Sequence, residues 1–260
     1  MTRAVSSFRA VAGVDGCKAG WIAVIRRAEE SDLEASVFLR FEDIVAALPI
    51  DAVIAVDMPI GLPDRISIGG RGPERLVREK LGARQSSVFS IPSRSAVYAE
   101  TAAFTTVDAW YAAHRRASVV ARATSHPPRA ISIQAFGIFG KIRELDEVLR
   151  THTGLAERVI ESHPEAAFWR LNGGREMQTP KKIRGQVNPA GMEERKALLS
   201  ACVIGRAFLD RAPPRGAGAD DFLDAAAMML VAERHAQGRA SPFPDPPGRD
   251  SFGLPIAIWT

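Results

Sequence analysis

The chain has 260 residues, of which 46% are hydrophobic and 25% charged, and this composition excludes a disordered or low-complexity protein. No apolar run approaches the roughly 18 residues of a membrane span, and two distant cysteines exclude a disulfide framework. The formal charge of +4 permits an anionic partner without requiring one. We find no signal peptide in the first residues and therefore expect a cytoplasmic protein.

Two of the predicted strands end on an aspartate. Three short apolar runs predict consecutive strands, with a tight turn between the first two: 11–15, 21–26 and 35–40. A short helix is predicted over 41–48, and the nearly continuous apolar run 51–57 predicts a strand buried on both faces. The first strand ends on Asp15 and the fourth on Asp57. If these strands are neighbours, both carboxylates point into one crevice.

The region from about 65 to 150 predicts a helical insertion within a single α/β domain that spans residues 1–260. Two long helices are predicted there, over 96–123 and 131–149. Guanidinium and hydroxyl groups are typical partners of a phosphate backbone, and one loop concentrates them: Arg84, Ser86, Ser87, Ser93 and Arg94. An ordered polar loop explains this group equally well. Lys141 and Lys181 are further candidates for phosphate binding, with a solvated surface as the alternative.

The last third of the chain predicts one strand and three helices, followed by a short edge strand. The strand, 158–162, carries Glu161, and the helix after it opens at His163, where Pro164 suits the first turn. The remaining predictions are a long amphipathic helix over 192–209, a helix over 221–235, a Pro-rich loop over 241–250 and an edge strand over 254–259.

Acidic residues within apolar surroundings mark a candidate metal site. They are Asp15, Asp57, Glu161 and a pair on one helix face, Asp221 and Asp224. Isolated buried carboxylates are costly, and metal-bound ones are the usual exception. We therefore expect the first three acids and Asp221 to bind Mg²⁺ or Mn²⁺, which hard oxygen ligands select, with Asp224 as a further catalytic acid.

Each of these acids also has a structural interpretation. Asp15 precedes a glycine, as many turn residues do, and Glu165 competes with Glu161 for the same role. Asp220 is expected to cap the last long helix, and the choice between Asp221 and Asp224 stays open. His163 could act as a base or ligand, but its place before a proline at a helix start is more typical of a structural histidine.

Four motifs in series resemble a family of unknown function, number four-twenty-nine, whose members are described as predicted nucleases. They are VDGCKAGW, AVDMPIGLP, ESHPEAAFW and GADDFLDA, and the resemblance covers about residues 11 to 259. It implies a ribonuclease H-like fold, in which three antiparallel strands precede parallel βα units. It also implies acids on the first strand, the fourth strand, the next strand and a C-terminal helix: Asp15, Asp57, Glu161, and Asp221 or Asp224. Pro73-Glu74 stands where the resemblance leads us to expect Cys-Asp.

Taken together, the sequence predicts a metal-dependent nuclease acting on nucleic acid or another phosphodiester. Carboxylate-bound divalent ions support such hydrolysis without a serine or histidine nucleophile. One alternative is a phosphotransferase of the actin-like ATPase class, in which the Asp15-Gly16 turn would cradle phosphate, although that class usually carries a second Asp-Gly loop. Another is a catalytically silent nucleic-acid-binding or scaffold protein on the same fold. The oligomeric state is open, and a homodimer is one option.

Overall fold

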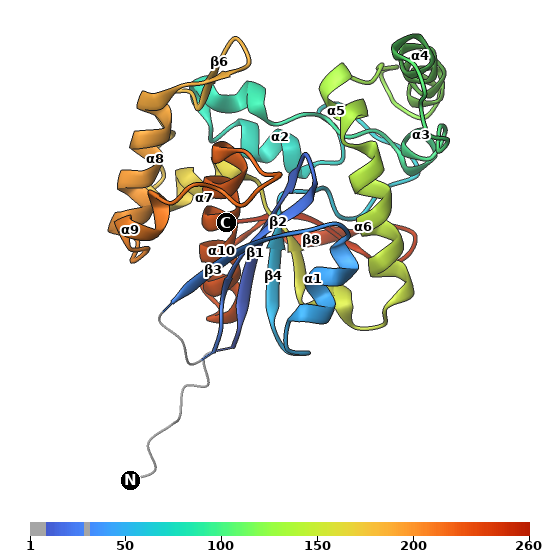
Figure 1. The fold of residues 1–260 in the computed structure, drawn as a ribbon. Coiled ribbons are helices and arrows are strands. Elements are labelled where there is room, and N and C mark those ends of the chain that lie inside the picture. Colours follow the sequence, from blue (N-terminus) through green and yellow to red (C-terminus); the bar gives the residue numbers. More distant parts are fainter. Residues whose placement is uncertain (1–8, 29–31) are drawn as a thin grey trace.

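A five-stranded mixed sheet forms the centre of the computed structural model, which describes residues 9–28 and 32–260 (Figure 1). In spatial order the strands are β3 (Leu33–Phe38), β2 (Gly20–Arg26), β1 (Val11–Cys17), β4 (Val53–Val56) and β5 (Val159–Glu161). The pairs β1–β2 and β2–β3 are antiparallel, whereas β1–β4 and β4–β5 are parallel. The predicted mixed α/β sheet is therefore confirmed.

Helices cover both faces of this sheet because strand residues alternate between its two sides. Val14 of β1 packs on the side of α1 (Phe41–Ala47) and α6 (Phe139–Thr151). Val11 of the same strand packs on the opposite side, against the core that includes α10 (Ala219–Ala236). Two covered faces explain why the central strands read as nearly continuous apolar runs.

The last long helix lies directly on the central strand at Gly13. A Cβ atom at this position would lie 1.9 Å from the backbone nitrogen of Met229 and 2.0 Å from the carbonyl oxygen of Ala225. Only glycine permits such a close approach of strand and helix backbones. This contact fixes the height of α10 above the sheet, and with it the position of Asp224.

The segment between β4 and β5 is helical, as predicted, but its helices are shorter than expected. It contains α2 (Pro73–Arg78), the 3₁₀ helix η1 (Gly82–Ser87), α3 (Arg94–Val97), α4 (Val107–Ala123), α5 (Ile133–Gly137), α6 and the 3₁₀ helix η2 (Leu155–Glu157). The helix predicted over 96–123 is broken because Thr106 starts a new helix, where its hydroxyl accepts from the Ala109 amide at 3.1 Å. The helix predicted over 131–149 is likewise divided, at Ile138.

Two C-terminal predictions are wrong. The helix predicted over 192–209 is split into α8 (Pro189–Ala201) and α9 (Arg206–Leu209), since Val203 has a positive φ of 71° that no helix accommodates. The predicted Pro-rich loop is strand β8 (Pro242–Arg249), which pairs with β9 (Pro255–Trp259) in a two-stranded hairpin. Trp259 of this hairpin forms a parallel bridge with Ser162, directly after β5 of the central sheet.

The remaining elements surround the carboxyl end of the central sheet. They are α7 (Pro164–Leu171) and the small hairpin of β6 (Lys182–Ile183) and β7 (Gln186–Val187). Figure 1 places α2 and α5 of the insertion and the β6 hairpin along the same end of the molecule. Over the residues that the structure describes, every helix falls short of the length and apolarity needed to cross a bilayer.

Candidate functional site

A cavity of about 470 Å³ lies at the carboxyl ends of the parallel strands. The core supplies Asp15 and Asp57 to its lining, and the insertion supplies Arg84 and Lys141. Lys181, just before the β6 hairpin, also lines it. Carboxyl ends of parallel strands are the usual location of ligand sites in open α/β sheets. The cavity is therefore the first candidate for a functional site.

Three aspartates from distant parts of the chain converge here: Asp15 and Asp57 line the cavity, whereas Asp224 is buried and is not part of its lining. Asp15, Asp57 and Asp224 each offer a carboxylate oxygen, and the three oxygens lie within 4.8 Å of one another. The first two are neighbours because β1 and β4 are parallel partners, and the Asp57 amide donates to Val14 at 2.9 Å. Asp224 arrives from α10, which Gly13 allows to lie close to β1. We call these three residues the carboxylate triad.

Burial and mutual repulsion disfavour the charged forms of the triad. Burial, and then the charge of Asp57, raise the pKa of Asp15 well above its ordinary value. Burial, and then the charge of Asp224, raise the pKa of Asp57 to about 8. Burial raises the pKa of Asp224 to about 6, although Lys181 opposes the shift. Negative charge in the triad is therefore only partly compensated by the protein itself.

Lys181 is the cation that the protein places in the triad. Its Nζ forms an ion pair with Oδ2 of Asp224, while Oδ1 of Asp224 is buried and has no hydrogen-bond partner. Burial favours the neutral amine, but the carboxylates of Asp224 and Asp15 outweigh it and raise the pKa of Lys181, which is therefore charged. The sequence suggests this lysine as a phosphate ligand or as a residue of a solvated surface, and the structure pairs it with Asp224.

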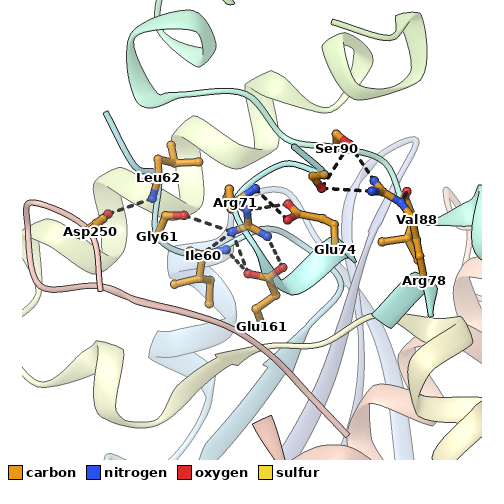
Figure 2. A network of polar contacts seen from close by, with 11 residues as sticks. Ile60, Gly61, Leu62, Arg71, Glu74, Arg78, Val88, Ser90, Glu161 and Asp250 are labelled. Carbon is orange, nitrogen blue, oxygen red and sulfur yellow. Dashed lines mark hydrogen bonds and ion pairs between the residues drawn. The ribbon is translucent and has the colours of Figure 1, made fainter. Parts of the chain in front are cut away.

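Glu161 lies in a different buried network, centred on Arg71 (Figure 2). Its Oε1 accepts from Nη2 of Arg71 at 2.6 Å, and its Oε2 accepts from Nη1 at 3.0 Å and from the Ile60 amide at 2.7 Å. Arg71 also binds Glu74 at 2.8 Å and the carbonyls of Ile60 and Gly61. Both oxygens of Glu161 are thus engaged, and the structure does not bring it into the triad.

Arg71 and Glu74 are contributions that the sequence analysis missed. Arg71 is a single basic residue in a basic loop, 90 positions away from Glu161, and no local pattern distinguishes it. Glu74 stands at the point where the sequence departed from the expected Cys-Asp pair, which was the one available signal. Together they attach the start of the insertion to the loop that follows Asp57.

The rival acids also have clear structural partners. Glu165 is buried and accepts from Arg195 at 2.6 Å, although its Oε2 has no partner. Asp220 does not cap α10, which begins one residue earlier, after Gly218; that prediction is wrong. Asp221 instead accepts from the Gly218 amide at 2.8 Å and so closes the first turn of the helix. Of the two helix acids, the structure brings Asp224 into the triad.

His163 joins the insertion to α7. Its Nδ1 accepts from the Glu165 amide at 3.2 Å, and its Nε2 donates to the Ser87 carbonyl at 3.3 Å. Burial lowers the pKa of His163 to about 4, so the imidazole is neutral. The structural interpretation of this residue fits the geometry.

Most of the predicted phosphate-binding residues do line the cavity. Arg84, Ser86, Ser87, Lys141 and Lys181 contribute to its wall. Lys141 donates to the Gly20 carbonyl and lies 4.5 Å from the Trp21 ring centre, next to the triad strand. Arg94 lies elsewhere: it forms ion pairs with Asp146 and, at 2.7 Å, with Asp250. Ser93 is fully buried and caps α3.

The fold and the site define an α/β protein with a largely buried carboxylate triad at the carboxyl end of a mixed sheet. The model of the family described as "Protein of unknown function (DUF429)" matches residues 13–249, and the chain belongs to that family. Comparison with curated proteins and with solved structures found no significant match. The triad's three residues lie within the matched range.

Proposed function

We propose that the protein is a metal-dependent phosphodiesterase, specifically a nuclease, on a ribonuclease H-like fold. The observation that carries this proposal is the convergence of Asp15, Asp57 and Asp224 within 4.8 Å, with Asp15 and Asp57 in the lining of a cavity. The strand order, with three antiparallel strands followed by two parallel ones, supports the ribonuclease H-like assignment. Because one fold serves several functions, the proposal depends more on the residues of the site than on the fold.

The donor set fits Mg²⁺ or Mn²⁺. Both are hard cations that prefer carboxylate oxygens, and two oxygens bound to one Mg²⁺ lie at most about 4.2 Å apart. The triad oxygens, within 4.8 Å of one another, need only small side-chain rotations to reach that spacing. Oδ1 of Asp224 is buried without a partner, as expected of an atom whose ligand is a metal ion.

The charge of the triad also favours a divalent cation. When ionised, three carboxylates beside the ammonium of Lys181 leave two negative charges in excess. Without a further cation, burial and repulsion keep the Asp57 pKa near 8, so a proton remains in the triad at neutral pH. A divalent ion would balance the excess without adding a second buried cationic side chain.

Each residue has a defined task in the proposed reaction. Asp15, Asp57 and Asp224 would hold the ion, which would supply a water of lowered pKa and a positive charge beside the phosphate. Arg84 and Lys141 line the same cavity and are placed to contact phosphate oxygens. Glu161 and Arg71 line the same cavity and position the loop after Asp57.

Calorimetric titration of Mn²⁺ tests the proposal. We expect the wild type to bind, and Asp15→Asn, Asp57→Asn and Asp224→Asn each to lose at least about tenfold in affinity. Asp51→Asn is the matched control, because this exposed acid precedes the opposite end of β4 and should bind as the wild type does. Binding that survives all three triad substitutions would contradict the proposal.

One observation favours a second candidate function. Lys181 already pairs with Asp224, as a cation would in a protein that needs no metal. In that case the fold would be a catalytically silent binding or scaffold protein. Absence of Mn²⁺ binding in the same titration, with and without nucleic acid, would favour this candidate.

A further inference from the structure

The cavity has a second distinctive wall, formed by residues that the metal site does not need. This wall is η1 and the residues after it, from Arg84 to Phe89, and it belongs to the insertion, whereas the triad belongs to the core. We call it the η1 wall. Because the two walls share one cavity, a ligand on the η1 wall lies within reach of the triad.

Arg84 on the η1 wall has an unused donor. Its Nε is buried and has no hydrogen-bond partner, and within the described residues no carboxylate forms an ion pair with its guanidinium. A buried donor without a partner is costly unless a ligand or water satisfies it. A guanidinium group matches the geometry of phosphate oxygens better than an ammonium does.

Phe89 on the same wall presents an unpartnered aromatic ring. Its side chain is 36% exposed and lines the cavity, and among the described residues no other ring stacks on it. Nucleic-acid bases stack on such rings without regard to sequence, because every base has a π-face. On this one short wall, the guanidinium group would contact the phosphate of a nucleotide and the aromatic ring would stack on its base.

The size of the cavity limits what can reach the triad. Its volume of about 470 Å³ falls in the range of small-molecule sites, roughly 300–1,000 Å³. A cavity of that volume can enclose a small molecule but not two paired strands. A single unpaired nucleotide does fit such a volume.

We propose that Arg84 and Phe89 form a subsite for one nucleotide, so that the substrate is a nucleotide-sized phosphodiester, free or at the end of a single strand. This inference rests on the proposed function for its chemistry, but the subsite itself does not depend on the metal. It excludes an intact duplex as substrate. It also assigns a function to a ring that contributes little to the core.

Binding without metal tests the subsite alone. A dinucleotide containing 2-aminopurine, titrated in EDTA, should lose fluorescence when its base stacks on Phe89. We expect Phe89→Ala and Arg84→Gln each to weaken binding by about tenfold. The matched controls are Phe104→Ala, with the same 36% exposure but outside the cavity, and Arg115→Gln, an exposed arginine of α4. Unchanged affinity in Phe89→Ala would overturn the subsite.

Hydrolysis with Mn²⁺ separates the substrate class from the proposed function. Thymidine 5′-p-nitrophenyl phosphate and methyl p-nitrophenyl phosphate share a leaving group and differ in the nucleoside. We expect the nucleoside ester to have the higher kcat/KM, and Phe89→Ala to reduce this advantage about tenfold while changing the methyl ester less than twofold. Equal kcat/KM for the two esters in the wild type would overturn the inference.

Longer substrates complete the test. A single-stranded oligonucleotide should be cleaved from its end, and the same strand in a blunt duplex should be cleaved at least about 100-fold more slowly. Equally rapid cleavage of the duplex would overturn the inference and leave the phosphodiesterase proposal intact. If no diester is cleaved, the proposed function fails, and the binding titration in EDTA still decides whether the subsite exists.

Discussion

The partly buried carboxylate of Asp57 makes the stability of the metal-free protein depend on pH. Its pKa of about 8 lies far above the value near 3.9 of an unfolded chain. Between these values the folded state binds more protons than the unfolded state, so the free energy of unfolding falls as pH rises. The contribution of Asp57 to the free energy of unfolding is fully present below about pH 4 and is lost as the pH rises to about 8.

We therefore predict that Asp57→Asn reduces the fall in the free energy of unfolding between pH 4 and pH 8. In urea denaturation with EDTA, the variant should gain about 2 kcal/mol relative to the wild type at pH 8, and less at pH 5. Asp51→Asn, at an exposed position, should follow the wild type at both pH values. An equal pH dependence of the free energy of unfolding in the wild type and Asp57→Asn would show that this carboxylate does not cause it.

Lys181 competes with a metal ion for the triad. Its ammonium pairs with Oδ2 of Asp224 and repels any cation placed there. We predict that Lys181→Met tightens Mn²⁺ binding about tenfold, as measured by calorimetry. Lys182→Met is the matched control, since that ammonium pairs with Asp220 at 2.5 Å and should have a smaller effect. Weaker Mn²⁺ binding in Lys181→Met would mean that the lysine helps to hold the ion.

At the scale of elements, the height of α10 above β1 depends on Gly13. Alanine there would place its Cβ 2.0 Å or less from backbone atoms of the helix, which must then move and carry Asp224 with it. We predict that Gly13→Ala lowers stability by about 3 kcal/mol and weakens Mn²⁺ binding at least tenfold. Gly140→Ala, in α6 with nothing within 4 Å, should retain both properties. Normal metal binding in Gly13→Ala would contradict this account of α10.

The loop after β4 depends on the Arg71 network. Arg71 joins Glu161, Glu74 and the carbonyl of Ile60 while its own side chain is 0% exposed. Removal of a buried partner leaves charged groups uncompensated, so Arg71→Met should destabilise the protein by about 3–5 kcal/mol in urea denaturation. The exposed pair of Arg75 with Glu79 offers a control, because Arg75→Met should change stability by less than about 1 kcal/mol. A loss of less than about 1 kcal/mol in Arg71→Met would show that the stability of the protein does not depend on this network.

At the scale of the whole molecule, the strands of the central sheet could be predicted from the sequence, whereas the C-terminal hairpin could not. The apolar runs that end near Asp15 and Asp57 predicted two strands but not their pairing, and β1 and β4 are parallel partners. The Pro-rich segment of β8 was interpreted as a loop, because local proline chemistry gave no sign of its pairing with β9.

The candidate site was predictable to a similar extent. Acid spacing indicated a carboxylate cluster with a contribution from α10, but could not choose between Asp221 and Asp224. That choice depends on the helix starting at Ala219, which assigns Asp221 to the first turn. Glu161 could not be separated from the triad, since its partner Arg71 is 90 residues away in the sequence. Long-range partners of this kind leave no local pattern.

The measurement that tests the central claim most directly is anomalous diffraction at the manganese edge from crystals of the wild type soaked in Mn²⁺. We predict a peak within about 2.2 Å of one oxygen each of Asp15, Asp57 and Asp224, with the Nζ of Lys181 displaced from Asp224. Asp224→Asn crystals should lose the peak. A wild-type map without manganese at the triad, in crystals that hold it elsewhere, would contradict the metal site and the phosphodiesterase proposed from it.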